Sequence, residues 1–527
     1  MRVEGLLSTS AGRFPQKTAL VSGSVRMSYT TLEGDANRLA HALRHHGISD
    51  GDRVVVFLEN CVEAVVSLFA TAKAGGVFSL VNPGTKSDKL AYILDKYGAS
   101  AIVTHERLLG TTREALAQSA CRPIMVVAGS DKPREGIAYD AMLDPAPGDG
   151  PPESGGIDVD LAMIVTTSGS TGAPKGVMMT HQNVDFASAS IMSYLESVPE
   201  DVVLSVLPLA FDYGLYQVLM SIRAGATLVL EKSFAYPASV LAKLRDEGVT
   251  GFPIVPTMGA ILLQMKSAIP NSLPRLRYLT STAASLPPAH IRALRDLFPG
   301  ARLYSMYGLT ECKRCTYLPP EELDRRPDSV GIAIPGTQAY VVDEEGRRAP
   351  PGQIGELVIR GGHVFKGYWN DQGETERMLK PGPYPWEKML HTGDLFRSDE
   401  DGYLYFVGRK DDIIKSAGEK VSPKEVENVL YALKGVREAA VVGVPHPVLG
   451  MAIHAIVAAE PSLGERDIIG HCAARLEPFM VPSSVEFRAS LPTTSTGKIR
   501  RSALQAEVLA HDAAGARRAQ RTPQAIA

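Results

Sequence analysis

Cysteine is scarce in this chain of 527 residues, and neither sign of charge prevails. Five cysteines are a small and odd number, so we expect no disulfide framework and place the protein in a reducing cytoplasm. Lys and Arg number 55 against 58 Asp and Glu, a formal net charge of −3. This balance gives no electrostatic reason to expect nucleic acid or an anionic membrane as a partner.

Long apolar runs are also missing. The first residues lack the apolar stretch of a signal peptide, so we expect none. The most apolar early stretch, residues 65–81, is interrupted by Lys73 and by two glycines. It is too short to span a bilayer and predicts a buried helix followed by a strand. We therefore expect no membrane span.

Helix and strand signals alternate along the first 150 residues. Residues 29–46 show helical spacing of apolar side chains, and residues 53–58 form a short apolar run typical of a buried strand. Such alternation predicts βαβ units and mainly parallel sheets. Residues 339–360 favour a more antiparallel, β-barrel-like region, and a small separate α/β unit is indicated from about residue 424. Because one core stops growing near 250–300 residues, we expect an α/β protein of at least two domains.

The strongest chemical signal is a loop rich in glycine and hydroxyl groups, TSGSTGAPKG at residues 167–176. It follows an apolar strand, and its glycines permit a tight turn whose N–H groups face inward, which suits phosphate oxygens. Lys175 adds a positive charge. The spacing fits neither a Walker A loop nor a Rossmann turn. A flexible surface linker is the alternative, and a Pro and a Lys at fixed places after a strand argue against it.

Four more motifs follow in order: YGLTE at 307, HTGDL at 391, GRKDDIIKSAGEKVSP at 408 and TSTGKIRR at 494. With the loop at 167, they resemble the adenylate-forming superfamily of acyl-CoA ligases, amino-acid adenylation enzymes and luciferases. The resemblance covers nearly the whole chain. It implies that ATP and a small-molecule carboxylic acid give acyl-AMP and pyrophosphate. A thiol then displaces AMP, from coenzyme A or from the phosphopantetheine arm of an acyl or peptidyl carrier protein.

The resemblance also implies a domain organisation and a nucleotide site. The large N-terminal domain would span residues 1–408, the hinge 409–412, and the small mobile C-terminal domain 413–527; a homodimer is compatible with the sequence. Tyr307 would stack on adenine, and Asp394 would accept hydrogen bonds from both ribose hydroxyls. The implied nucleotide-binding residues are Thr167, Ser168, Gly169, Ser170, Thr171, Gly172, Lys175, Thr282, Ala283, Ala284, Tyr307, Gly308, Asp394 and Arg409.

Catalysis is implied for Lys498, with Thr310, Glu311 and Lys175. Thr310 would touch the α-phosphate, and Glu311 would bind Mg²⁺, a hard cation that prefers carboxylate and phosphate oxygens. Lys498 would bring a mobile positive charge to the carboxylate and the α-phosphate. The implied hinge residues are Lys410 and Asp411, and the implied residues of the thiol step are Lys415, Gly418 and Lys420.

The acid pocket is expected at Phe211, Asp212, Tyr213 and Tyr216. A buried aspartate needs a partner, which is either an amino group of the substrate or a nearby Arg, Tyr or backbone amide. Cys312-Lys-Arg-Cys315 directly follows Glu311, and its two cations could hold pyrophosphate, hold an anionic group of the substrate, or face solvent. This CxxC lacks a second ligand pair at zinc spacing, so we do not expect a metal there.

Three further functions stay open from the sequence. One is a stand-alone amino-acid adenylation enzyme, suggested by Asp212. Another is transfer of the adenylate to an amine or a small anion instead of a thiol. The last is an inactive binding module of the same fold, against which the intact set of functional side chains argues: Lys175, Glu311, Asp394, Arg409 and Lys498.

Overall fold

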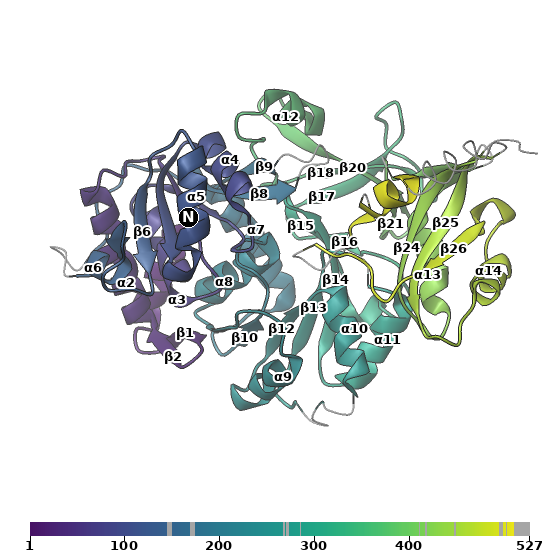
Figure 1. The fold of residues 1–527 in the computed structure, drawn as a ribbon, viewed down its shortest axis with the longest axis horizontal. Helices are drawn as coiled ribbons and strands as arrows, with labels where there is room; N and C mark the ends of the chain where they lie inside the picture. The colour runs from purple at the N-terminus through teal and green to yellow at the C-terminus, as the bar shows by residue number, and fades with distance from the viewer. Residues whose placement is uncertain are drawn as a thin grey trace, which may run out of the picture.

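The computed structural model describes residues 1–144, 150–168, 174–266, 269, 273–284, 286–410, 412–416, 419–446, 449–494, 499–501 and 503–510. Within them, helices and strands alternate in a mixed α/β fold with a large N-terminal and a small C-terminal domain (Figure 1). The expected fold class is confirmed.

A seven-stranded sheet occupies the first part of the N-terminal domain, in the order β7-β6-β5-β3-β4-β8-β9. Its strands are β3 (Arg53–Phe57), β4 (Val77–Leu80), β5 (Ala99–His105), β6 (Ile124–Ala128), β7 (Ile137–Ala138), β8 (Leu161–Ser168) and β9 (Pro174–Thr180). Neighbours are parallel except β8 and β9, which form an antiparallel pair. The predicted βαβ organisation is therefore found, and the hairpin of β8 and β9 carries the glycine-rich loop.

A nine-stranded sheet follows, in the order β16-β15-β14-β13-β12-β10-β11-β1-β2. Its strands are β1 (Thr18–Ser22), β2 (Val25–Ser28), β10 (Val202–Ser205), β11 (Thr227–Leu230), β12 (Gly251–Ile254), β13 (Tyr278–Ser281), β14 (Arg302–Leu309), β15 (Lys313–Leu318) and β16 (Ile332–Ala333). The middle strands from β1 to β14 are parallel. Because carboxyl ends of parallel strands share one edge of a sheet, the residues after β13 and within the end of β14 come together.

Helices cover both sheets. They are α1 (Val3–Arg13), α2 (Tyr29–His45), α3 (Val62–Lys73), α4 (Ser87–Tyr97), α5 (Leu109–Gln118), α6 (Tyr139–Met142), α7 (His181–Leu195), α8 (Asp212–Ala224), α9 (Pro237–Asp246), α10 (Pro256–Gln264) and α11 (Pro288–Leu297). Ser28 caps α2 by accepting a hydrogen bond from the Thr31 N–H. The charge inside the early apolar run is buried, with Lys73 Nζ 2.7 Å from Glu33 Oε1. No helix in the described part of the chain is long and apolar enough to cross a membrane.

Two smaller sheets complete the fold. The antiparallel region that was expected near residues 339–360 comprises β17 (Gln338–Val342), β18 (Gly355–Arg360), β19 (Leu379–Pro381), β20 (Lys388–Ser398) and β21 (Leu404–Arg409), with α12 (Gln372–Met378) beside it. The C-terminal domain has β22 (Ile414–Ser416), β23 (Glu419–Val421), β24 (Val436–His446), β25 (Gly450–Ala459) and β26 (Ser484–Phe487), with α13 (Pro423–Ala432) and α14 (Glu465–Ala473). The main apolar core ends at Leu404, and the core of the C-terminal domain begins at Ile414.

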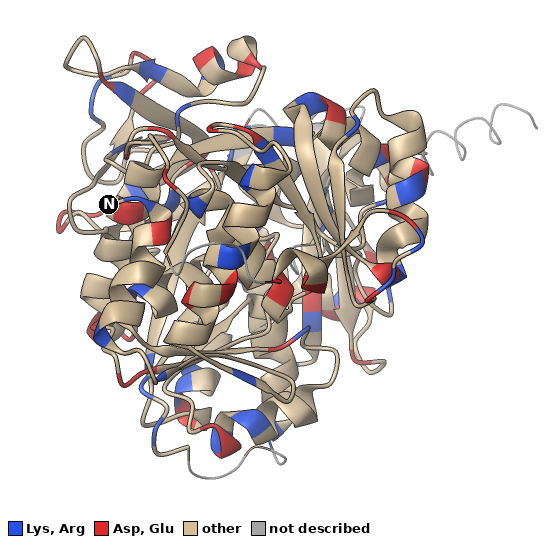
Figure 2. Ribbon diagram, turned by 90° about the vertical axis from the view of Figure 1, so that its left-hand side faces the viewer, with Lys and Arg blue, Asp and Glu red and all other residues tan. Residues whose placement is uncertain are grey.

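Basic and acidic residues are interspersed along the ribbon, and neither kind dominates the elements in view in Figure 2. This mixture agrees with the near-zero net charge. Many of these charges form ion pairs across elements, such as Arg302 with Glu196 at 2.6 Å and Arg26 with Glu247 at 2.6 Å. Such exposed pairs are screened by solvent and contribute little to stability.

His363, after β18, makes stability depend on pH. Its ring is fully buried and stacks on Phe186 of α7 at 5.5 Å, and burial lowers its pKa to about 4. Because this pKa lies below the value near 6.5 of an unfolded chain, the free energy of unfolding falls as pH drops from 6.5 towards 4. Between pH 7 and pH 5 we expect this histidine to lower the free energy of unfolding by about 2 kcal/mol.

Urea unfolding at pH 7 and pH 5 measures this effect. His363→Gln should lose about 2 kcal/mol less than the parent over this interval, whereas His46→Gln, at an exposed position, should behave as the parent does. An equal loss in the parent and in His363→Gln would contradict the assignment.

Candidate active site

The glycine-rich loop sits at the turn of the hairpin formed by β8 and β9. Thr167 pairs with Lys175, and Ser168 pairs with Pro174. A strand therefore follows the loop, in agreement with a spacing that fits no Walker A motif, in which a helix would follow. Of the predicted phosphate-binding residues, Gly169, Ser170, Thr171 and Gly172 lie outside the described residues, as does the side chain of Ser168.

Lys175 is held by two side chains that the sequence did not point to. Its Nζ forms an ion pair with Glu374 of α12 and lies 5.4 Å from the ring centre of Tyr368. Backbone bonds fix this arrangement, since the Trp369 N–H donates to the Gly176 carbonyl at 2.8 Å. Hydrogen bonds from Arg377, and then from Lys175, lower the pKa of Glu374 to about 2. Glu374 is therefore ionised at neutral pH and offsets the charge of Lys175.

Tyr368 links the glycine-rich hairpin to Glu311. Its hydroxyl donates to Glu311 Oε1 at 2.6 Å, and the Phe365 N–H donates to the Glu311 carbonyl at 2.8 Å. Glu311 is half-buried at the turn after β14. A single carboxylate beside the predicted phosphate site would suit Mg²⁺, which is commonly held by one or two carboxylates together with phosphates and water. In the described part of the chain, no three His, Cys, Asp or Glu side chains gather as a metal site.

A second cluster forms where β14, β20 and β21 meet. Asp394 and Arg409 are directly opposite each other on neighbouring strands, with Arg409 Nε 3.4 Å from Asp394 Oδ1. Tyr307 Oη donates to Asp394 Oδ2 at 2.5 Å, and its ring packs edge-on against Phe396 at 5.0 Å. Burial, and then the charge of Asp394, raise the pKa of Tyr307, so its hydroxyl remains a donor. This brings together three predicted nucleotide residues that are up to about a hundred positions apart.

The segment after β13 lies beside this cluster. β13 is parallel to β14, so Thr282, Ala283 and Ala284 follow at the edge where β14 reaches Tyr307 and Gly308. Ala283 has φ +81°, a left-handed conformation that is uncommon for a residue with a side chain and marks local strain. Gly308 is required, because a Cβ there would come within 1.7 Å of the Lys313 carbonyl oxygen. The close antiparallel pairing of β14 and β15 next to their turn therefore depends on Gly308.

The predicted acid-pocket residues surround the start of α8. Phe211 precedes the helix and Asp212 begins it. Tyr213 Oη donates to the Thr280 carbonyl at 2.8 Å, which ties α8 to β13. Tyr216 is fully buried. These side chains therefore stand next to the strand end that precedes residues 282–284.

The cations of the CxxC segment do not face solvent. Lys313 and Arg314 are 3% and 4% exposed, so that alternative is wrong. Lys313 Nζ lies 3.9 Å from Asp212 Oδ2, which gives this aspartate a cationic partner within the chain. Burial lowers the pKa of Lys313, and the charge of Asp212 counteracts this. The flanking Cys312 and Cys315 are free, fully buried thiols.

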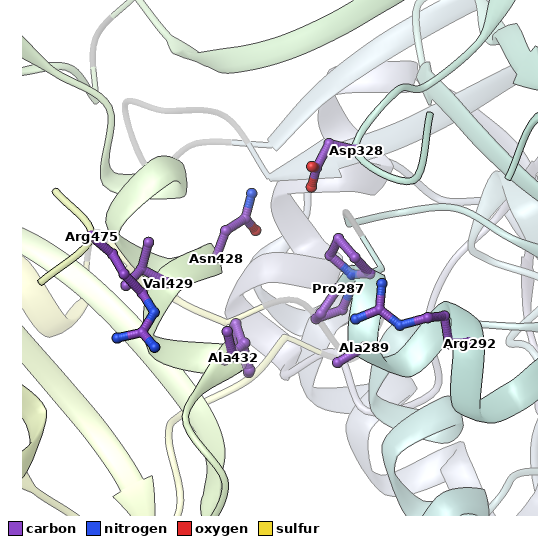
Figure 3. A pocket seen from close by; sticks show the side chains of 10 residues that line it. Pro287, Ala289, Arg292, Asp328, Asn428, Val429, Ala432 and Arg475 are labelled. Carbon is purple, nitrogen blue, oxygen red and sulfur yellow. The ribbon is translucent and has the colours of Figure 1, made fainter. Parts of the chain in front are cut away.

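The predicted residues of the second step are only partly described. Lys410 donates its N–H to the Gly393 carbonyl at 2.9 Å. Lys498, Asp411, Gly418 and the side chains of Lys415 and Lys420 lie outside the described residues. The two domains touch at a crevice of about 200 Å³ between α11 and α13, lined by Pro287, Asp328 and Asn428 among others (Figure 3). Nearby, the rings of His290 and Tyr431 are 6.2 Å apart.

Glu374→Gln should strengthen nucleotide binding. The substitution removes the carboxylate that offsets Lys175, so phosphates would meet a less neutralised cation, and we expect the Kd for ATP to fall about three- to tenfold. Isothermal titration with ATP measures it. Glu376→Gln, an exposed change of the same charge on the same helix, is the control and should leave the Kd unchanged. A weaker Kd in Glu374→Gln than in the control would show instead that Glu374 is needed to position Lys175.

Known proteins resemble this chain along almost its entire length. Residues 7–369 match the family described as AMP-binding enzyme, and residues 425–498 match the AMP-binding enzyme C-terminal domain. A long-chain-fatty-acid–CoA ligase of Bacillus subtilis is 31% identical over 97% of this chain and 95% of its own. A feruloyl-CoA synthase of Amycolatopsis is 34% identical over 95% and 98%. The solved o-succinylbenzoate CoA synthetase of Bacillus subtilis, in complex with its acyl-adenylate intermediate, has a TM-score of 0.83 and 26% identity over 95% and 97%.

Proposed function

This chain belongs to the AMP-binding enzyme family, and we propose that it catalyses ATP-dependent activation of a carboxylic acid to acyl-AMP, followed by transfer of the acyl group to coenzyme A. It is an AMP-forming acid–CoA ligase. The observation that carries this proposal is that one short segment, the end of β14 and the turn after it, joins two clusters of predicted site residues. Tyr307 contacts Asp394, which pairs with Arg409, and four positions later Glu311 contacts Tyr368, whose ring lies beside Lys175.

In the first step, a carboxylate oxygen attacks the α-phosphorus of ATP, and the bond to pyrophosphate breaks. Both reactants are anionic, so positive charge and hydrogen-bond donors must offset their repulsion. We assign Lys175 and the loop at 167–172 to the phosphates, Thr310 to the α-phosphate, and Lys498 to the point of attack. Glu311 fits one ligand position of Mg²⁺, whose charge would stabilise the phosphate oxygens.

The nucleoside lies at the second cluster in this proposal. Asp394 is 3% exposed and holds two acceptor oxygens, which suit two ribose hydroxyls. Tyr307 offers an aromatic face for adenine, and Arg409 adds a cation at the rim. Thr282, Ala283, Ala284 and Gly308 border the same space as backbone and small side chains.

In the second step, the thiolate sulfur attacks the carbonyl carbon, and AMP leaves with the former carboxylate oxygen. We propose that the domains rotate between steps about Lys410 and Asp411, with the boundaries at 408 and 413. The interval between the two cores, Leu404 to Ile414, supports this placement. We assign Lys415, Gly418 and Lys420 to the thiol step. A carrier-protein phosphopantetheine is the alternative acceptor, and a homodimer in the cytoplasm remains a prediction.

Pyrophosphate release over a panel of fatty, aryl, dicarboxylic and amino acids tests the proposal. We expect release with at least one acid, and AMP formation that rises several-fold when coenzyme A is added. Coenzyme A and a loaded carrier protein are compared in parallel to decide the acceptor. No release with any acid would overturn the proposed function. Amino acids are not the favoured class, because Asp212 already faces Lys313.

A further inference from the structure

Two consecutive cations, Lys313 and Arg314, lie inside the protein at the start of β15. They are 3% and 4% exposed. Five of the six residues of β15 are buried, and Tyr317 is half-buried, so both faces of this strand are covered and neither cation reaches solvent. Lys313 has φ +59°, a left-handed turn conformation, which lets both side chains enter the interior one after the other.

Both cations face the start of α8, the element that carries the acid-pocket residues. The Arg314 guanidinium carbon lies 4.6 Å from the ring centre of Tyr213 and 6.0 Å from that of Tyr216. Lys313 Nζ lies 5.7 Å from the ring centre of Tyr216 and 3.9 Å from Asp212 Oδ2. These contacts are with α8, whereas Lys175 of the glycine-rich hairpin pairs with Glu374 of α12, an element that Figure 1 places apart from α8.

The hydrogen-bonding capacity of this cluster is not filled. Within the described residues, Lys313 Nζ, Arg314 Nε, Arg314 Nη2 and Tyr216 Oη have no hydrogen-bond partner, although all four atoms are buried. Among the described residues, Asp212 is the carboxylate in ion-pair distance of Lys313, and the charge of Glu311 acts on it from further away. Buried charges are stable only when paired and hydrogen-bonded, so the cluster lacks one anion with several acceptor oxygens.

We propose that Lys313, Arg314 and Tyr216 bind a second anionic group of the acid, and that the preferred substrates are dicarboxylic acids or acids with a comparable distal anion. This rests on the proposed function, which brings the reacting carboxylate to the nucleotide end of the site. The faces of Tyr213 and Tyr216 then pack against the part of the acid between its two charges. A guanidinium offers a fork of donors that matches a carboxylate. Pyrophosphate is the competing ligand, and the acid is favoured because the ion pair and ring contacts of the two cations, with Asp212, Tyr213 and Tyr216, are all with α8.

Acid-dependent exchange of labelled pyrophosphate into ATP tests the proposal with matched pairs of acids. Straight-chain dicarboxylates of three to eight carbons and benzene dicarboxylates are each compared with the monocarboxylate of equal size. The best dicarboxylate should exceed its neutral match by about 100-fold or more in kcat/KM, because the unpaired buried donors reject an acid without the second anion. Preference for the neutral acid in every pair would overturn the proposal.

Arg314→Met identifies the residue responsible. It should lower kcat/KM for the dicarboxylate about 100-fold and leave the KM for ATP and the rate with the neutral match nearly unchanged. Lys313→Met should act in the same direction. Arg314→Lys should retain part of the preference, and Arg325→Met, at an exposed position, should retain all of it. If Arg314→Met raises the KM for pyrophosphate and leaves the ratio between acids unchanged, the cations serve pyrophosphate and the proposal is wrong.

Direct binding separates this inference from the proposed function. Isothermal titration of the best-fitting dicarboxylate into the parent and into Arg314→Met requires no turnover. At least tenfold weaker binding in the variant supports the anion site even if no acid gives exchange, a result that would overturn the proposed function alone. Equal binding in the two proteins overturns the anion site. Thermal unfolding of each variant verifies folding, and Arg314→Lys replaces Arg314→Met in the titration if the latter does not fold.

Discussion

Replacement of Lys498 by alanine is expected to lower the rate of acid-dependent pyrophosphate release by about 10²–10³-fold, the usual effect of removing one group that stabilises developing charge. The carboxylate and the triphosphate repel each other, and negative charge builds up on the phosphoryl oxygens during attack. In the proposed mechanism, Lys498 of the C-terminal domain offsets this charge at the reacting atoms. Pyrophosphate release under saturating ATP and acid measures the loss.

The second half-reaction gives the discriminating control for Lys498. When purified acyl-AMP is supplied with coenzyme A, Lys498→Ala should form thioester at nearly the parent rate, since no phosphoryl transfer remains. Arg500→Ala, an exposed cation two positions away, should leave both half-reactions unchanged. A similar loss in both half-reactions for Lys498→Ala would contradict the assigned role.

Replacement of Asp394 by asparagine is expected to raise the KM for ATP by about 10–100-fold, because hydrogen bonds to a charged acceptor are worth about 1.5–3 kcal/mol. The carboxylate is 3% exposed, and its oxygens face Tyr307 Oη and Arg409 Nε. An amide keeps the shape, removes the charge and offers one acceptor oxygen in place of two. Initial rates over a range of ATP concentrations measure the KM.

Tyr307→Phe is the matched variant for Asp394. It removes one hydrogen bond to the carboxylate and keeps both the ring and the charge, so the KM for ATP should rise less than about tenfold. The KM for the acid should not change in either variant. An unchanged KM for ATP in Asp394→Asn, with the protein still folded, would show that this cluster does not hold the nucleotide.

Much of the fold was predictable because burial dictates local patterns. The apolar run at 53–58 is β3 at Arg53–Phe57, and the helical spacing at 29–46 is α2 at Tyr29–His45. Both elements are covered by the core, so their hydrophobic period is clear. The interrupted run at 65–81 is α3 followed by β4, as expected, with its lysine paired to Glu33.

Residues in motifs were predictable, but their partners were not. Asp394 and Arg409 meet because β20 and β21 pair in one register, which agrees with the shared role implied by their motifs. Tyr368 and Glu374 stand outside the motifs that were considered, and only the tertiary contact of residues 366–369 with β9 brings them to Lys175. A single aromatic or acidic residue in a loop carries no local sign of such a distant partner.

The cations at 313 and 314 show the limit of local reasoning most clearly. Consecutive Lys and Arg in a strand usually indicate a solvated position, yet here both faces of β15 are covered. Burial of two cations depends on α8, a helix that begins about a hundred residues earlier in the chain. The sequence therefore left solvent, pyrophosphate and substrate as open alternatives, and the structure removed the first.

The formation of an acyl-adenylate is the central claim, and the fate of the carboxylate oxygens tests it most directly. An acid that the enzyme accepts is labelled with ¹⁸O in both carboxylate oxygens and is converted with ATP and coenzyme A. Mass spectrometry then measures the ¹⁸O content of AMP and pyrophosphate. The account predicts one ¹⁸O atom in AMP and none in pyrophosphate, because the oxygen that attacks the α-phosphorus leaves with AMP when the thiol enters. Unlabelled AMP, or label in inorganic phosphate together with ADP, would contradict it.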